Sequence, residues 1–156
     1  MKSTFPTVLR ELLRTHQAFL SYAASHVQKL DLTLPQFDII ITLGNTDGLP
    51  YKILGEKTLI TKGTLTGVIS RLEDKGLVQR DASKTDGRSQ IIRLTETGYA
   101  LFERTFPEHL LFINRLFDNY SPEDVINLEA ALKQLHEAVI SLRSEEQEKI
   151  VDDTEA

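Results

Sequence analysis

The chain has 156 residues, 40% hydrophobic and 26% charged, enough for one compact core or a small domain with an added arm. No apolar run reaches the roughly 20 residues that span a bilayer, and the N-terminus lacks the apolar segment of a secretory signal. We therefore expect a cytoplasmic protein without a membrane partner. The absence of cysteine excludes disulfides, thiolate zinc sites and thiol redox switches.

The net charge of −5 is unevenly distributed along the chain. Positions 56–93 contain eight basic and five acidic residues, a charge of +3, which leaves −8 for the remainder. A basic middle between acidic ends is a charge asymmetry that makes nucleic acid a candidate partner. A chance fluctuation on a solvated surface would give the same count.

Apolar residues at three- and four-residue spacing predict an amphipathic helix over residues 7–30. A second helix is predicted from residue 34 to 43, with Thr33 as its N-cap and Pro35 in the first turn. Residues 44–48 are rich in glycine and asparagine and end that helix. A short helix over residues 51–59 follows.

The next helix is predicted over residues 61–75, capped by Thr61 and followed by Gly76, which suits a left-handed C′ position. Its apolar residues repeat at helical spacing and predict one buried face. They are Leu65, Val68, Ile69 and Leu72. Two short helices joined tightly, the second ending in glycine, indicate a helix-turn-helix.

A β-hairpin is predicted next, with strands over residues 77–80 and 89–94 and a turn that contains Asp86-Gly87. The hairpin carries Lys84, Arg88 and Arg93 and is therefore basic.

Two long helices complete the pattern. The first covers residues 95–119, is capped by Thr95, and contains Pro107, which should kink or divide it. The second begins at Ser121-Pro122, and its apolar residues form a seam of nearly three heptads. The seam consists of Val125, Leu128, Leu132, Leu135, Val139 and Leu142. We expect the acidic tail to be frayed or disordered beyond Lys149.

The predicted fold is mainly α with a small β-hairpin, in the order α-α-α-α-β-β-α-α. Its central helix-turn-helix and hairpin lie between terminal helices that carry apolar stripes. We assign residues 1–32 and 99–149 to dimerisation, 33–98 to DNA binding and 150–156 to an acidic tail.

Catalytic chemistry is not indicated by any motif. The four histidines, His16, His26, His109 and His136, stand apart, with no second histidine three or four residues away. A nucleophile elbow, a phosphate-binding glycine loop and a metalloprotease motif are all absent from the sequence. We expect no enzyme activity, no cofactor and no metal site.

The helix over residues 61–75 is the candidate for reading DNA bases. It displays short hydrogen-bonding side chains and cations that fit a major groove about 12 Å wide. The candidate contacts are Thr61, Lys62, Gly63, Thr64, Thr66, Ser70 and Arg71. A solvent-facing polar stripe, which most amphipathic helices have, is the alternative.

The hairpin supplies two further candidates. Arg88 can extend from the tip into a minor groove, whose negative potential favours arginine, and Lys84 can meet phosphate. Asp86 either orients Arg88 through a salt bridge or serves only as turn chemistry with Gly87.

Five motifs in this order and spacing resemble the MarR family of regulators. They are LPQF at 34–37, TKGTLT at 61–66, RLEDKGLVQR at 71–80, DGR at 86–88 and LTETG at 94–98. The detailed likeness covers residues 34–98, and the helix order matches over nearly the whole chain. Gly67 departs from the family, in which many members have a polar or basic residue there.

The resemblance implies a winged helix-turn-helix in a triangular homodimer on a palindromic operator. It also implies that residues 61–71 form the recognition helix and that Arg88 is the minor-groove residue at the tip of the wing. Such proteins are usually repressors released by a small aromatic ligand, by oxidation or by metal, and the lack of cysteine removes thiol oxidation here.

An effector pocket is expected where the first, second and fifth helices meet. The candidate lining residues are His16, Phe19, Tyr22, Phe37 and Phe102. Ordinary core packing is the alternative for these side chains. Two other functions stay open: a winged-helix protein-interaction module, and a metal-responsive regulator that uses His16, His26 or His109.

Overall fold

The computed structural model describes residues 5–58, 60–82 and 90–155, without the side chains of Lys62 and residues 147–155. The chain divides into two compact units, Met1–Ile113 and Asn114–Ala156. The first unit contains α1 (Phe5–Val27), a 3₁₀ turn (Gln28–Leu30), α2 (Leu34–Leu43), β1 (Leu49–Pro50), α3 (Tyr51–Lys57), α4 (Lys62–Asp74), β2 (Val78–Ala82), β3 (Gln90–Leu94) and α5 (Glu96–Asn114). The second contains a 3₁₀ turn (Arg115–Phe117) and α6 (Pro122–Glu155). The predicted fold class, mainly α with a small sheet, is confirmed.

Helix boundaries follow the capping residues seen in the sequence. Thr33 and Gln36 form a capping box in which each side chain bonds the other residue's backbone N–H. The Thr95 hydroxyl accepts from the N–H of Gly98 at 3.0 Å and begins α5. Gly76 has φ +68°, and the N–H of Leu77 returns to the carbonyl of Leu72, as expected where glycine ends a helix.

The sheet has one strand more than predicted. Its order is β1-β3-β2, all antiparallel, with Val78 opposite Leu94 and Arg80 opposite Ile92. The extra strand, β1, is only two residues long and pairs Leu49 with Ile92. Two residues carry no periodicity, so β1 could not be found in the sequence.

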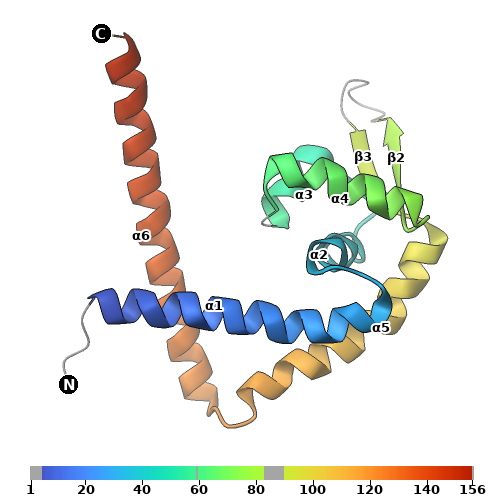
Figure 1. Ribbon diagram of the computed structural model, residues 1–156, viewed down its shortest axis with the longest axis horizontal. Coiled ribbons are helices and arrows are strands. Elements are labelled where there is room, and N and C mark those ends of the chain that lie inside the picture. The colour runs from blue at the N-terminus through green and yellow to red at the C-terminus, as the bar shows by residue number, and fades with distance from the viewer. Residues whose placement is uncertain (1–4, 59, 83–89, 156) are drawn as a thin grey trace. The chain divides into compact units, whose positions relative to one another are not determined.

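The core lies in the first unit, where α2 is placed between α1 and α4 (Figure 1). All four predicted inward residues of α4 are buried. The buried cluster comprises Val27, Leu32, Phe37, Ile39, Ile40, Leu43, Leu54, Leu65, Val68, Ile69, Leu72, Leu77, Val78, Ile92 and Phe102. Gly98 lets α5 pack tightly here, because a Cβ at this position would lie 2.0 Å from the carbonyl oxygen of Leu77.

Two helices differ from the expectation. α5 is continuous through Pro107, so the division that was one of the two predicted effects of this proline does not occur; Pro107 and Glu103 are exposed, and water can bond the carbonyl left without its partner. It also ends at Asn114, and a 3₁₀ turn replaces the rest of the predicted helix. α6 continues past Lys149 to Glu155.

Helices α1 and α6 have long apolar faces that are exposed to solvent. In α1 only Ala23 and Val27 are buried, while Phe5 is 72% exposed and Leu13 is 63% exposed. In α6, Ile126 and Leu142 are 64% and 61% exposed. Among the described residues, no helix is both long and apolar enough to cross a membrane.

Candidate nucleic-acid interface

The start of α4 presents short polar groups to solvent. Thr61 takes the N-cap position, but its hydroxyl bonds the Thr64 hydroxyl at 2.9 Å instead of a backbone N–H. The expected side-chain cap at Thr61 is therefore absent. Amide groups in the first turn stay available to an anion such as a DNA phosphate. Gly63 in this turn is exposed, while the side chain of Lys62 lies outside the described residues.

The outer face of α4 is polar over its whole length. Thr64, Thr66 and Arg71 are exposed, and Gly67 between them is half-buried. A Cβ at Gly67 would have Arg71 Nη2 as its nearest neighbour, at 3.9 Å. The helix therefore has an apolar inner face and a hydroxyl-rich outer face that ends in a cation, which suits contact with base edges.

A hydroxyl pair joins α3 to α4 on this face. The hydroxyl oxygens of Tyr51 and Thr66 lie 2.5 Å apart and share a hydrogen bond. Thr66 was a candidate for DNA contact, whereas Tyr51 was missed. The sequence holds no signal for it, because the contact depends on how two helices cross.

Arg80 joins β2 to the side of α4. Its Nη2 donates to the Ser70 hydroxyl at 3.1 Å, and its Nε lies 3.0 Å from Glu73 Oε2, an ion pair without the alignment of a hydrogen bond. Ser70 is half-buried, so the structure gives it a role in holding the helix against the sheet. Any contact from Ser70 to DNA would have to share that hydroxyl.

The described base of the hairpin carries a second ion pair. Arg93 Nε on β3 lies 2.6 Å from Asp81 Oδ2 on β2. Asp81 thus neutralises one of the hairpin's cations. Lys84, Arg88 and the expected Asp86–Arg88 salt bridge lie outside the described residues.

The residues expected to line an effector pocket are placed in three groups. His16 and Phe19 are exposed on α1. Tyr22 stacks on Phe112 at 4.2 Å between ring centroids and donates to its carbonyl oxygen at 2.8 Å. Phe37 and Phe102 are both buried in the core cluster.

Two of the candidate metal ligands, His26 and His109, meet beside these stacked rings. Nδ1 of His26 and Nδ1 of His109 lie 3.2 Å apart, a distance at which one ring donates and the other accepts. Burial, and next the charge of His26, hold the pKa of His109 below its usual value. No group of three or more metal-binding side chains occurs among the described residues, where His16 also makes no hydrogen bond or ring contact with this pair.

Comparison with known proteins gives the same architecture. A profile of the MarR family matches residues 32–90. The HTH-type transcriptional regulator MhqR of Bacillus subtilis is 30% identical over 80% of this chain and 86% of its own length.

Solved structures share the fold. AbsC, a MarR family transcriptional regulator from Streptomyces coelicolor, superposes with a TM-score of 0.82 at 26% identity, covering 90% of this chain and 97% of its own. Sco3205 from the same organism, solved in complex with DNA, has a TM-score of 0.80 at 23% identity over 88% and 90%. NadR in complex with 4-hydroxyphenylacetate has a TM-score of 0.70 at 24% identity over 86% and 96%. The identity to MhqR over most of both chains, together with the fold, shows that this chain belongs to the MarR family of transcriptional regulators.

Proposed function

We propose that this protein is a homodimeric repressor that binds a pseudo-palindromic operator and is released by a small aromatic ligand. As a MarR-family regulator it is a DNA-binding protein and not an enzyme. The observation that carries the proposal is the polar outer face of α4, held on the core by Tyr51 and Arg80.

Operator contacts are proposed at the residues expected from the sequence. α4 would lie in the major groove, with the hairpin tip in the neighbouring minor groove. The contacting residues would be Thr61, Lys62, Gly63, Thr64, Thr66, Ser70, Arg71, Lys84 and Arg88. The solved complex of Sco3205 with DNA supports use of this fold on duplex DNA. The protein would act where the DNA is, in the cytoplasm.

Dimerisation is supported by the apolar faces of α1 and α6. A monomer in water would leave Phe5, Leu13, Ile126 and Leu142 largely exposed, a hazard for aggregation. Pairing of these terminal helices with a second copy would bury them. Two-fold symmetry would then place two recognition helices about one turn of DNA, roughly 34 Å, apart.

Release by an aromatic acid is the proposed regulation. NadR has been solved with 4-hydroxyphenylacetate, and BpsR of Bordetella bronchiseptica is described as regulated in DNA binding by 6-hydroxynicotinic acid. A ligand of this type lowers operator affinity only if it prefers the DNA-free conformation. Aromatic acids, tested singly, should therefore weaken operator binding.

The test begins with selection of bound fragments from genomic DNA by the purified protein. Fluorescence anisotropy on a selected fragment should give an affinity that falls steeply with salt, since phosphate contacts release counterions. Arg88→Ala should weaken binding about 10-fold or more, a loss of the size expected for one good contact to DNA. Arg143→Ala, on α6, is the matched control and should leave affinity unchanged.

Two results would favour the other functions. Failure to retain any fragment would favour a protein-interaction module. The contact of His26 with His109 keeps a metal-responsive regulator as the second candidate. In that case zinc, and no aromatic acid, would change both thermal stability and operator affinity.

A further inference from the structure

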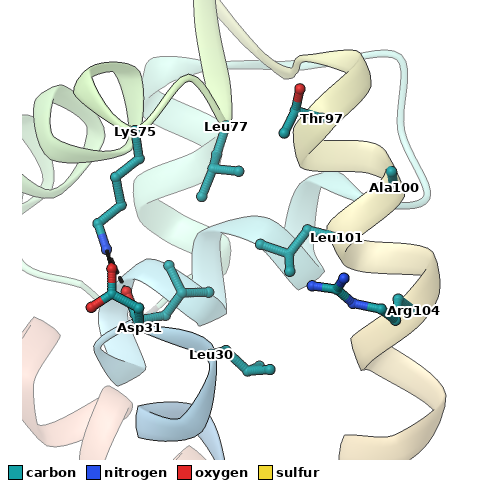
Figure 2. A pocket seen from close by; sticks show the side chains of 9 residues that line it. Leu30, Asp31, Lys75, Leu77, Thr97, Ala100, Leu101 and Arg104 are labelled. Carbon is teal, nitrogen blue, oxygen red and sulfur yellow. Dashed lines mark hydrogen bonds and ion pairs between the residues drawn. The ribbon is translucent and has the colours of Figure 1, made fainter.

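A cavity of about 450 Å³ lies where the turn before α2, the end of α4 and the first turns of α5 meet (Figure 2). It is lined in part by Leu30, Leu77 and Leu101. Its volume falls within the roughly 300–1,000 Å³ of small-molecule sites. None of the residues expected from the sequence to bind an effector lines it.

Two cations flank this apolar lining. Figure 2 shows Lys75, at the end of α4, directed toward Asp31 on one side of the cavity, and Arg104, on α5, at the other side. Within the part of the chain that the structure describes, Arg104 has no hydrogen-bond or ion-pair partner. A guanidinium with five free donors beside leucine side chains is suited to a carboxylate whose body is apolar.

Lys75 already binds one carboxylate, that of Asp31. Its Nζ lies 2.9 Å from Asp31 Oδ2 and also donates to the Asp31 carbonyl oxygen. An ammonium has three donors, so one remains for a ligand. The Asp31 carboxylate is 98% exposed and competes with any incoming anion for Lys75.

We propose that this cavity binds a small amphipathic organic anion, whose carboxylate pairs with Arg104 and Lys75 and whose apolar body rests on Leu77 and Leu101. The proposal deepens the effector part of the proposed function. The expected effect of the anion on operator affinity rests on the proposed function, whereas binding of the anion to the cavity does not depend on it.

The cavity is placed to affect α4. Lys75 is the C-cap of that helix, and the carbonyl oxygen of the next residue, Gly76, accepts from the Thr95 hydroxyl at 2.6 Å, immediately before α5. A ligand held by Lys75 and Arg104 therefore ties the end of the recognition helix to α5. If the spacing of these two elements changes on DNA, ligand and operator affinities are coupled reciprocally.

Calorimetric titration of the full chain without DNA tests the site. The probe is 2-naphthoate, and neutral 2-naphthamide is its matched control. Naphthoate should bind and naphthamide should not. Arg104→Gln should weaken naphthoate binding about 10- to 100-fold, as expected for loss of a charge-assisted hydrogen-bond pair.

Three further variants sharpen the result. Arg104→Lys, which keeps the charge, should retain most of the affinity. Asp31→Asn should tighten binding about threefold, because it removes the competing carboxylate while asparagine tolerates the φ of 55° at this position. Arg115→Gln, which does not line the cavity, should have no effect. Thermal unfolding without probe confirms that each variant is folded.

The outcomes separate this site from the proposed function. Equal affinity for both probes, no naphthoate binding at millimolar concentration, or equal losses in Arg104→Gln and Arg115→Gln would overturn the site. Binding through Arg104 by a protein that retains no DNA supports the site and contradicts the repressor. Binding that leaves operator affinity unchanged overturns the coupling to α4.

Discussion

Single side chains on α4 divide into those that face outward without bonding another helix or strand and those that also hold the helix in place. Thr64 and Arg71 are exposed, whereas Thr66 shares a hydrogen bond with Tyr51 and Ser70 accepts one from Arg80. The second pair would contact DNA only at a cost to the packing of the helix. Loss of Ser70 or Thr66 should therefore change stability as well as affinity.

Asp38 on α2 provides a pH prediction at this scale. Burial raises the pKa of its carboxyl to about 6. Because the folded-state pKa lies above the unfolded value, the contribution of Asp38 to stability is complete below about pH 4 and is lost as the pH rises through about 6. Asp38→Asn should raise the free energy of unfolding by about 1 kcal/mol at pH 7.5, allowing for partial solvent access, and by little at pH 4.5.

Urea denaturation at the two pH values measures this difference. Asp47→Asn, at an exposed position between α2 and β1, is the matched control and should change stability little at either pH. A gain in Asp38→Asn that is equal at both pH values would show that ionisation is not its cause.

At the scale of elements, three polar contacts among the described side chains join α4 to its neighbours. Tyr51 joins it to α3, Arg80 joins it to β2, and Lys75 joins it to the turn before α2. The contact of Tyr51 with Thr66 is the tie nearest the polar outer face. This contact fixes the orientation of the polar outer face of α4, and it therefore affects DNA affinity by positioning that face.

A double-mutant cycle on Tyr51→Phe and Thr66→Val tests this tie. Each single variant should lower operator affinity about 3- to 10-fold, since one hydrogen bond is worth about 1 kcal/mol. The double variant should lose less than the product of the two effects, because either change alone already breaks the contact. Fully additive losses in anisotropy titrations would show that the two hydroxyls act independently.

A ring cluster joins α1 to α5 in the same unit. His26 and His109 form its polar centre, and Phe37 lies edge-on to His109 with 4.6 Å between ring centroids. Because its pKa is lowered, His109 favours the neutral form, and its contribution to stability is lost as the pH falls below about 6.5. Acid should thus loosen the junction of α1 with α5.

At the scale of the whole molecule, the apolar faces of α1 and α6 carry the proposed dimer. Leu13→Asp places a charge on the exposed apolar face of α1 without touching the buried core, since Leu13 is 63% exposed. Sedimentation equilibrium at micromolar concentration should show a dimer for the natural sequence and a monomer for this variant. Operator affinity should fall with it, because two-fold binding needs both copies.

Asn45→Asp adds the same charge at an exposed position between α2 and β1 and should remain dimeric. A monomeric natural protein, or an unchanged mass in Leu13→Asp, would count against the terminal helices as the dimer interface.

The sequence by itself determined the local structure, because capping residues and apolar spacing act within a few residues of one another. The starts of α2 and α5, the inward face of α4 and the left-handed Gly76 were all predicted in this way. The motifs at 34–98 also indicate the family, because their order and spacing are properties of the sequence alone.

Only the tertiary structure decided which distant side chains meet. Tyr51 with Thr66, Arg80 with Ser70, His26 with His109, and the cavity at Arg104 depend on crossing angles between elements far apart in the chain. β1 likewise exists because β3 offers it a partner. Such contacts leave no periodic trace in a single sequence, since each is selected by packing of the complete core.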